Sequence, residues 1–475
     1  MTNELVQLTA CEAVQKLKAG DVSPLELIDA AEARIAATDG AVNAMPTQCF
    51  ERARERATTL MNSSSDGAQG PGWLAGLPIA IKDLMPVAGV RTTYGSPIFA
   101  DNIPQKSDVL VDRLERQGAV VIGKTNTPEF GAGANTFNEV FGATRNPWNT
   151  DKTCAGSSGG AAVAVATGQA WLAHGSDLGG SLRTPASFCG ITGLRPSPGR
   201  VPRSSLAMPF SSLAVDGPMG RDTADVALFL DAMAGLESAD PLSYPAPALS
   251  YTEAVRNPDL PLRIAYSPDL GLCPVDPEVA SICADAAQKF VDMGATVVEA
   301  SPAFTGAQEA FHILRAAQFA ADKGGLLDKH RDLVKPDLVW NIEKGRALTS
   351  EEIGHAEISR GQLYRRVVRF FEDYDLLICP TAIVPPFDVE TRYIEEAGGV
   401  KFDNYMDWLT ITYALTLTGC PIVSSPAGLT ASGLPVGVQL VAPPRREDVA
   451  LAAATLLEKA VGLTAQLPID PRPPA

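Results

Sequence analysis

The sequence C-A-G-S-S-G-G fills residues 154–160, and D-L-G-G-S-L-R follows at residues 177–183. Between them, an alanine- and valine-rich run within residues 159–169 is typical of a helix packed tightly in a protein core. Glycine lets the backbone adopt positive φ values and lets amide groups approach a reacting atom. The stretch therefore predicts a buried helix with a serine-bearing loop on each side.

Apolar runs alternate with helical patterns on both sides of this stretch. Residues 77–84 (L-P-I-A-I-K-D-L) and 119–126 (A-V-V-I-G-K-T-N) are typical of buried strands, and residues 108–117 of a helix between them. Further strands are predicted at residues 262–266, 296–298, 375–379 and 436–441, and further helices at residues 222–235, 277–293 and 447–461. This alternation of helix and strand indicates an α/β fold.

Both ends of the chain carry recognisable signals. Thr9 and Ser23 are each followed three residues later by glutamate, which is the capping-box pattern, so two helices should open the chain. Residues 62–72 predict a surface loop, and the proline-rich residues 467–475 a surface strap or a disordered end. We find no repeat of fixed period and no linker composition, so residues 1–475 are predicted to form one large domain.

The composition excludes several classes of protein. The 475 residues carry a net charge of −16 and 45% of them are hydrophobic, which is typical of a soluble globular protein that repels nucleic-acid phosphates. The N-terminus lacks a basic region followed by an apolar one, and no run approaches the roughly 18 apolar residues of a membrane span. We expect a cytoplasmic protein, monomeric or homodimeric, without a nucleic-acid or membrane partner.

The cysteines and histidines do not form a metal-binding pattern. Eight cysteines are scattered without a C-x-x-C pair, and four histidines stand apart without an H-E-x-x-H motif. We expect reduced thiols, no metal and no cofactor. His174 remains a minor candidate for the site because it lies near Asp177.

Two kinds of chemistry fit the glycine- and serine-rich segments. A phosphate-binding nest is the weaker one, because G-S-S-G-G lacks the lysine of G-x-x-x-x-G-K-[ST] and the spacing of G-x-G-x-x-G. In acyl transfer, Ser181 would attack a carbonyl carbon, and backbone amides at residues 178–181 would stabilise the oxyanion. A serine nucleophile needs a base, yet no histidine is evident for that role and these segments lack the G-x-S-x-G elbow.

A buried lysine can serve as the base if it is neutral. Its pKa must then fall from about 10.4 by roughly 3 units, which requires burial. Lys82 and Lys124 each end an apolar strand, and the pattern of residues does not choose between them. The ordinary alternative for both is a strand-end lysine whose amine reaches water.

Further motifs along the chain complete a family pattern. They are G-L-P-I-A-I-K-D at 76–83, G-K-T-N-T-P-E-F at 123–130, G-A-T-R-N-P-W at 142–148, G-L-R-P-S-P-G-R at 193–200 and G-L-P-V-G-V-Q-L at 433–440. Together with the two serine segments they resemble the amidase signature family of serine hydrolases. The resemblance implies one domain with a central mixed β-sheet flanked by helices. It is weakest at residues 63–72 and 245–372, and we expect the latter to form much of the substrate pocket.

The resemblance also implies the catalytic roles. Lys82, in the I-K-D motif, is the base, Ser157 is the bridging serine that follows a cis peptide bond, and Ser181 is the nucleophile. The two serines are 24 residues apart, which is the usual spacing in the family. The oxyanion hole would be formed by the backbone amides of Leu178, Gly179, Gly180 and Ser181.

Residues near the three catalytic positions have expected supporting roles or depart from the family pattern. Ser158, Asp177 and Arg183 are expected to hold the loops in place. Ala155 stands where glycine is usual in the family, and Leu178 replaces a commoner threonine or alanine, which makes the pocket more apolar.

The family hydrolyses amides, ureas and carbamates, so we expect an aryl or alkyl amide or carbamate as substrate, with esterase or urethanase activity as an extension. Met208 and Phe210 are predicted to line the pocket. One alternative is the glutaminase-type component of a tRNA-dependent amidotransferase, which commonly has glutamine where Thr184 stands here. The other alternative is a non-catalytic binding protein on the same fold.

Overall fold

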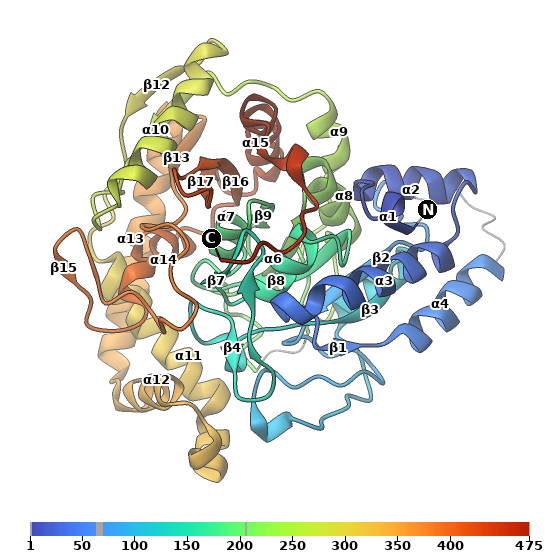
Figure 1. Ribbon diagram of the computed structural model, residues 1–475. Coiled ribbons are helices and arrows are strands. Elements are labelled where there is room, and N and C mark those ends of the chain that lie inside the picture. The colour runs from blue at the N-terminus through green and yellow to red at the C-terminus, as the bar shows by residue number, and fades with distance from the viewer. Residues whose placement is uncertain (1, 63–69, 205–206, 475) are drawn as a thin grey trace.

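An eleven-stranded mixed sheet runs through the part of the chain that the computed structural model describes, residues 2–62, 70–204 and 207–474 (Figure 1). The strand order is β1-β3-β2-β8-β10-β9-β16-β17-β13-β11-β12. The strands are β1 (Thr47–Gln48), β2 (Pro78–Lys82), β3 (Val120–Thr125), β8 (Leu172–Asp177), β9 (Thr192–Arg195), β10 (Val215–Gly220), β11 (Arg263–Tyr266), β12 (Thr296–Glu299), β13 (Leu376–Pro380), β16 (Ile422–Leu429) and β17 (Pro435–Val441). β2 runs parallel to β3 and β8, whereas β10 is antiparallel to β8. The predicted α/β fold with a central mixed sheet is confirmed.

Helices surround this sheet, with α1–α4 beside β2 and β3 and α10–α13 towards the opposite end (Figure 1). They are α1 (Thr2–Leu5), α2 (Ala10–Ala19), α3 (Pro24–Val42), α4 (Phe50–Asn62), α5 (Val109–Arg116), α6 (Gly159–Ala166), α7 (Arg183–Cys189), α8 (Thr223–Met233), α9 (Tyr251–Arg256), α10 (Pro277–Asp292), α11 (Ala307–His330), α12 (Pro336–Ala347), α13 (Ser350–Asp373), α14 (Thr410–Thr416) and α15 (Glu447–Val461). The predicted strands and helices all overlap elements of this set. The helices α11 to α13 lie in a region for which the sequence patterns predicted no element.

Short elements complete the regular structure of the described residues. Three small ladders pair β4 (Phe137–Asn138) with β5 (Gly142–Ala143), β6 (Arg145–Asn146) with β7 (Asn149–Thr153), and β14 (Glu396–Ala397) with β15 (Val400–Lys401). Single 3-10 turns occur at η1 (Pro97–Phe99), η2 (Glu129–Gly131), η3 (Arg331–Leu333), η4 (Asp407–Leu409) and η5 (Leu463–Gln466).

Capping boxes begin α2 and α3, as the sequence predicted. The Thr9 hydroxyl accepts a hydrogen bond from the Glu12 N–H at 3.1 Å, and the Glu12 carboxylate accepts one from the Thr9 N–H at 2.8 Å. Ser23 and Glu26 make the same reciprocal pair at the start of α3. Each box satisfies two backbone donors that a bare helix start would leave unpaired.

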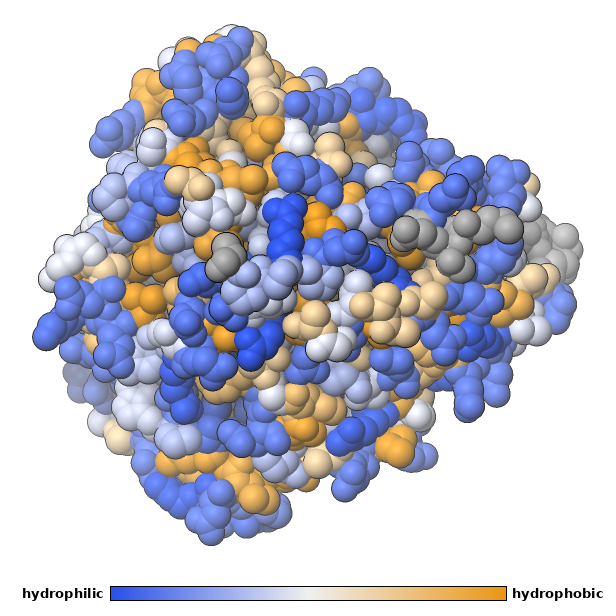
Figure 2. All heavy atoms as spheres, in the orientation of Figure 1, coloured by the Kyte–Doolittle hydropathy of each residue, from blue (hydrophilic) through white to orange (hydrophobic). Residues whose placement is uncertain are grey.

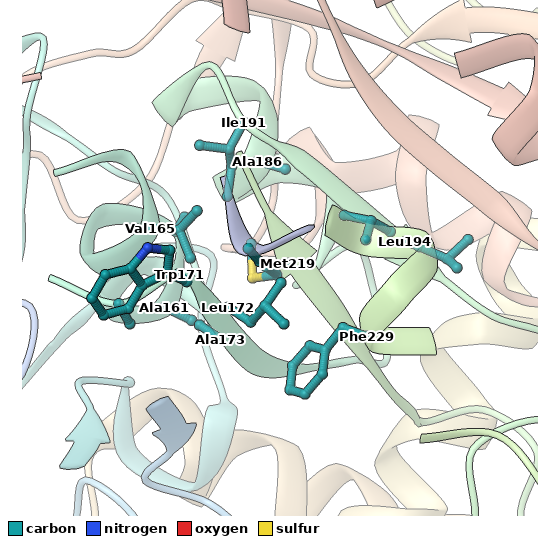
Figure 3. Close-up of a cluster of buried hydrophobic side chains, with 14 of the residues drawn as sticks. Ala161, Val165, Trp171, Leu172, Ala173, Ala186, Ile191, Leu194, Met219 and Phe229 are labelled. Atoms are coloured by element: carbon teal, nitrogen blue, oxygen red, sulfur yellow. The ribbon is translucent and has the colours of Figure 1, made fainter. Parts of the chain in front are cut away.

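The predicted buried helix is α6, at the centre of the core. All of its residues are buried, and Figure 3 shows Ala161 and Val165 beside Trp171. Gly160 is required in this helix because a Cβ there would lie 2.4 Å from the backbone nitrogen of Asn126. The close packing fixes the segment that leads into α6, and this segment carries one of the two serine loops.

The two predicted irregular segments have different outcomes. Residues 63–69 of the predicted surface loop lie outside the described residues, and Asn62 belongs to the end of α4. The proline-rich C-terminal segment is an ordered strap as far as residue 474. Ile469 donates its N–H to the Ala166 carbonyl and Arg472 donates to the Pro147 carbonyl, both at 2.9 Å.

The face drawn in Figure 2 is mostly hydrophilic, with hydrophobic side chains distributed between the polar ones. None of the helices in residues 2–62, 70–204 and 207–474 has the length and apolar character needed to cross a membrane.

Candidate active site

Lys82 lies at the end of β2, between the parallel strands β3 and β8, with its side chain completely buried. Its Nζ is 2.7 Å from Ser157 Oγ, 2.8 Å from Ser158 Oγ and 3.1 Å from Ser176 Oγ. The strand therefore ends in an amine that contacts three hydroxyl groups. Sequence reasoning missed Ser176, although its position in a polar H-G-S-D ending to an apolar strand is a usable signal.

Burial lowers the pKa of Lys82 to about 7. The carboxylates of Asp216 and Asp177 act in the opposite direction, and the guanidinium of Arg203 adds to the lowering. Because the hydrogen-bond partners of the amine are neutral hydroxyls, no direct ion pair holds the proton on it. A substantial fraction of Lys82 is therefore neutral near neutral pH.

Lys124 is equally buried at the end of β3 but has different partners. Its Nζ lies 3.3 Å from Asp83 Oδ1 and donates to the Met85 carbonyl at 2.7 Å and to Thr92 Oγ1 at 2.9 Å. Burial lowers its pKa and the Asp83 carboxylate opposes this. The structure thus places Lys124 in an ion pair, away from the serine loops.

The first serine loop joins β7 to α6. The peptide bond between Gly156 and Ser157 is cis, and Ser157 is 2% exposed. Ala155, which stands where glycine is usual, adopts a left-handed φ of 57° and packs its methyl group in a small cluster with Phe188 and Ala382. The loop therefore reaches this conformation without glycine at that position.

The second serine loop joins β8 to α7 and is held by the Asp177 carboxylate. Its oxygens accept hydrogen bonds from the Leu182 N–H at 3.1 Å and from both Nε and Nη2 of Arg183 at 3.0 Å. Arg195 donates to Asp177 Oδ1 at 3.0 Å as well. Burial raises the pKa of Asp177, but the two guanidinium groups outweigh it and hold the pKa well below its usual value. The carboxylate thus stays ionised and fixes the loop.

The backbone of the second loop leaves several amides free. The Gly180 N–H donates to Asp177 Oδ1 at 3.0 Å, so this amide already has a partner. The amides of Leu178, Gly179 and Ser181 donate to no acceptor among the residues that the structure describes. Three of the four amides that were expected to form the oxyanion hole are therefore free to donate to a ligand, and the fourth, that of Gly180, is occupied. Position 180 requires glycine, because its φ is 122° and a Cβ there would lie 2.6 Å from Thr412 Oγ1.

Both serine loops open into one cavity of about 420 Å³. Ser157, Ser176 and Ser181 line it together with Leu178 and Gly179. The other walls carry many aromatic rings, those of Tyr94, Phe99, Phe130, Phe311, Phe319, Tyr405 and Tyr413. The cavity thus combines a hydroxyl- and amide-rich end with apolar walls, an arrangement typical of small-molecule sites.

Two aromatic rings stack at the serine end of the cavity. The rings of Phe311 and Tyr413 are parallel within 5° and their centroids are 4.2 Å apart. Phe311 belongs to α11, and a Cβ on Gly179 would lie 3.3 Å from its ring. The stack therefore lies directly against the second serine loop.

Met208 and Phe210 do not line this cavity, so the prediction of them as pocket residues is wrong. Their side chains are 40% and 77% exposed. Ala207, next to Met208, does line the cavity. Hydrophobic character in a loop does not reveal which way the side chains point, and here the walls come from α11 and from residues 405–413 instead.

His174 is buried on β8, where it pairs with Ile81 of β2. Its Nε2 is 3.0 Å from Asp216 Oδ1, and the other oxygen of Asp216 is 2.5 Å from Arg203 Nε. The residues that the structure describes contain no cluster of three or more histidine, cysteine or acidic side chains arranged to hold a metal ion.

The sequence matches the family model described as Amidase over residues 26–451. An acylamidase from Rhodococcus erythropolis is 38% identical over 457 residues, which cover 95% of each chain. A glutamyl-tRNA(Gln) amidotransferase subunit from Moorella thermoacetica is 36% identical over 480 residues, which cover 96% of this chain and 97% of that protein.

Solved structures give the same result. A bacterial aryl acylamidase of the amidase signature enzymes superimposes with a TM-score of 0.90 at 27% identity, covering 98% of this chain and all of that one. A 6-aminohexanoate cyclic dimer hydrolase, solved with its substrate, has a TM-score of 0.88 at 27% identity and covers 98% of this chain and 99% of its own.

Proposed function

The chain belongs to the amidase signature family and is an amidohydrolase that acts on carbon–nitrogen bonds of amides, and on that premise we propose that it works through a serine acyl-enzyme. Ser181 is the nucleophile, Ser157 passes its proton, and Lys82 is the base. The observation that carries this assignment is the contact of Lys82 Nζ with Ser157 Oγ at 2.7 Å, in a cavity that Ser181 also lines.

The first half of the reaction forms the acyl-enzyme. Neutral Lys82 accepts the proton of Ser157, which accepts the proton of Ser181 as the Ser181 oxygen attacks the carbonyl carbon. The carbonyl oxygen becomes an oxyanion that accepts hydrogen bonds from the free amides of the second loop, those of Leu178, Gly179 and Ser181. The relay then returns the proton to the leaving nitrogen, and the carbon–nitrogen bond breaks.

The second half hydrolyses the acyl-enzyme by the reverse path. Water gives a proton through Ser157 to Lys82 as its oxygen attacks the acyl carbon, and the proton returns to Ser181 as that oxygen leaves. Asp177 and Arg183 take no part in bond making in this scheme. They keep the amides in place so that the donors need no rearrangement when charge develops.

The aromatic walls support an aryl or alkyl amide, or a carbamate, as the substrate. The stacked pair of Phe311 and Tyr413 offers a flat apolar surface beside the nucleophile. Much of this wall comes from α11, within residues 245–372, which we propose to be the segment that sets the choice of substrate. The acylamidase and aryl acylamidase relatives agree with this class.

The test is covalent labelling combined with a substrate panel. A fluorophosphonate probe should label Ser181, as mass spectrometry of the labelled peptide would reveal, and Ser181→Ala should prevent labelling. The panel compares anilides, alkyl amides, carbamates and esters. If the wild-type protein neither reacts with the probe nor hydrolyses any of these compounds, the chain is a binding protein on this fold and the proposal fails.

A second candidate is the glutaminase component of an amidotransferase, which the Moorella thermoacetica relative supports. Thr184 in place of glutamine and the aromatic cavity favour the first candidate. Free glutamine as the best substrate, together with a partner protein that co-purifies in fixed ratio, would favour the second.

A further inference from the structure

Arg315 is a buried cation in the wall of the catalytic cavity. It belongs to α11 and is 5% exposed. Its guanidinium lies 4.4 Å from the ring centroid of Phe319 and 5.5 Å from that of Tyr405, so two aromatic faces hold it. Nη1 donates to Asn341 Oδ1 at 2.5 Å and Nη2 donates to the Tyr405 hydroxyl oxygen at 2.7 Å. All of these partners are neutral.

No carboxylate among the described residues forms an ion pair with Arg315. Asp337 pairs with Arg392 at 3.0 Å, and Asp407 lies 3.2 Å from His312 Nε2. Asp322 also lines the cavity, but it is next to Lys323 and within ion-pair distance of neither that lysine nor Arg315. A buried guanidinium without a counter-ion is costly, so the protein retains it at a cost that a bound anion would offset.

The Tyr405 hydroxyl is a second free hydrogen-bond donor beside Arg315. The Tyr405 oxygen accepts from Arg315 Nη2 at 2.7 Å and from Asn341 Nδ2 at 2.7 Å. The orientation of Asn341 is fixed, because arginine only donates and must face Oδ1. The Tyr405 O–H must therefore donate elsewhere, and no acceptor for it is present among the described residues. Arg315 Nε also donates to no acceptor among them.

We propose that Arg315 and Tyr405 bind a carboxylate on the substrate, remote from the scissile bond. A carboxylate only accepts hydrogen bonds, carries the missing negative charge and can take bonds from the guanidinium and the phenol together. Both residues line the same cavity as Ser157 and Ser181, so the anion and the scissile amide belong to one molecule. The preferred substrates are amides with a carboxylate at the far end. This specificity rests on the hydrolysis proposed above.

The experiment compares substrates that differ only in charge. One pair places the group on the acyl side, glutaric acid mono-4-nitroanilide against its terminal carboxamide. The other places it on the amine side, 4-acetamidobenzoate against 4-acetamidobenzamide. The wild-type kcat/KM should be at least about tenfold higher for the carboxylate in one pair, since hydrogen bonds to charged groups are the stronger ones. Equal or lower values for both carboxylates would overturn the proposal.

Variants then assign the preference to these residues. Arg315→Met should abolish the preference and leave kcat/KM for the neutral member within about threefold, and Tyr405→Phe should reduce the preference with its ring packing kept. Lys329→Met, an exposed cation on the same helix, is the matched control and should change neither value. An equal loss on charged and neutral substrates, or an unchanged preference in both variants, would contradict the assignment.

A binding measurement tests the carboxylate site independently of the hydrolysis reaction. If no substrate is hydrolysed, the proposed function fails, and calorimetry with glutaric acid mono-4-nitroanilide still tests the carboxylate site. Binding should weaken about tenfold in Arg315→Met but not in Lys329→Met. If binding is equal in wild type and Arg315→Met, the site is not there.

Discussion

Two buried lysines end the neighbouring strands β2 and β3, and their partners separate them. Lys124 forms an ion pair with Asp83, whereas Lys82 contacts only hydroxyl groups. An amine that has no carboxylate partner gives up its proton more readily after burial. The lysine in the ion pair therefore suits a structural role and the other one suits proton transfer.

The pKa of Lys82 predicts how activity depends on pH. Only the neutral amine accepts a proton, and burial lowers the pKa to about 7. For a neutral anilide, kcat/KM should therefore rise as the pH increases through about 7 and then level off, because it follows the deprotonated fraction of the free enzyme. The measurement is a pH profile of kcat/KM.

The control for this profile is the second lysine. Lys82→Met should remove activity at every pH. Lys124→Met leaves Asp83 buried without its cation, so it should lower the free energy of unfolding. The Lys124→Met protein that remains folded should show the same pH profile of kcat/KM as the wild type. A rate that is flat between about pH 5 and 9, or an equal loss of activity in the folded Lys124→Met protein, would contradict Lys82 as the base.

The two serines should differ in what their removal costs. Ser181→Ala removes the attacking oxygen, so kcat should fall by at least about 10³-fold. Ser157→Ala removes the proton bridge but leaves Ser181, so kcat should fall by about 10² to 10³-fold with residual turnover. Single-turnover kinetics and mass detection of an acyl-enzyme measure both effects. Unchanged activity in either folded variant would contradict its role.

Sequence reasoning reached the site only in part. Lys82, Ser157 and Ser181 were assigned because the motifs around them resemble the amidase signature family, whereas the residue pattern alone did not choose between Lys82 and Lys124. Met208 and Phe210 failed as pocket residues because the direction of a loop side chain depends on contacts with distant segments. The same reason explains why local patterns did not indicate Arg315 or Tyr405, whose pairing spans 90 residues.

At the scale of elements, local signals predicted what local interactions determine. The capping boxes at Thr9 and Ser23 marked the starts of α2 and α3, and apolar runs marked β2, β3, β13 and β17. The strands β9 and β10 carry glycine, proline and charged residues, so their apolar pattern is weak. They become strands because their neighbours in the sheet pair with them, which no local pattern reports.

The C-terminal strap gives a prediction about stability at this scale. Leu467 and Ile469 are buried, and Arg34 donates to the Ile469 carbonyl at 2.9 Å. Removing residues 467–475 should lower the free energy of unfolding by about 3 kcal/mol or more, because two large aliphatic side chains lose their burial. The measurement is the shift of the urea midpoint.

A shorter truncation provides the control for the strap. A chain that ends at Arg472 keeps both buried side chains and the backbone bonds to Pro147 and Thr150, so its midpoint should equal that of the full chain. If the longer truncation also leaves the midpoint unchanged, the strap contributes nothing to stability.

At the scale of the whole molecule, buried acids join the N-terminal helices to the C-terminal half. Asp222 and Asp225 begin α8, and Glu458 of α15 accepts hydrogen bonds from Thr223. Asp225 Oδ1 accepts from the Cys11 N–H of α2 at 2.9 Å, while Asp225 Oδ2 has no hydrogen-bond partner in the described part of the chain. Three elements remote in sequence thus meet at carboxyl groups.

These acids are expected to make stability depend on pH. Burial, and then the Asp222 carboxylate, raise the pKa of Asp225 to about 8 against the opposing effect of Arg221. Burial also raises the pKa of Glu458 to about 7. When the pKa of an acid is higher in the folded state than in the unfolded state, the acid contributes to the free energy of unfolding while it is protonated in both states. This contribution is full below the unfolded-state pKa of about 4 and is lost as the pH rises towards the folded-state pKa. The free energy of unfolding should therefore fall between about pH 4 and 8 from this cluster.

Asp225→Asn tests this contribution, because the amide keeps an acceptor for the Cys11 N–H and does not ionise. The difference in the free energy of unfolding between the variant and the wild type should shift in favour of the variant as the pH rises from about 5 to 9. In the wild type, the carboxyl group ionises more readily in the unfolded chain than in the folded protein, so a rising pH favours unfolding, whereas the amide of the variant does not ionise. Urea midpoints at both pH values measure the difference. Asp21→Asn, at an exposed position, should give the same difference at both. If the Asp225→Asn difference is also independent of pH, the pKa of the carboxyl group does not differ between the folded and unfolded states, and this prediction is wrong.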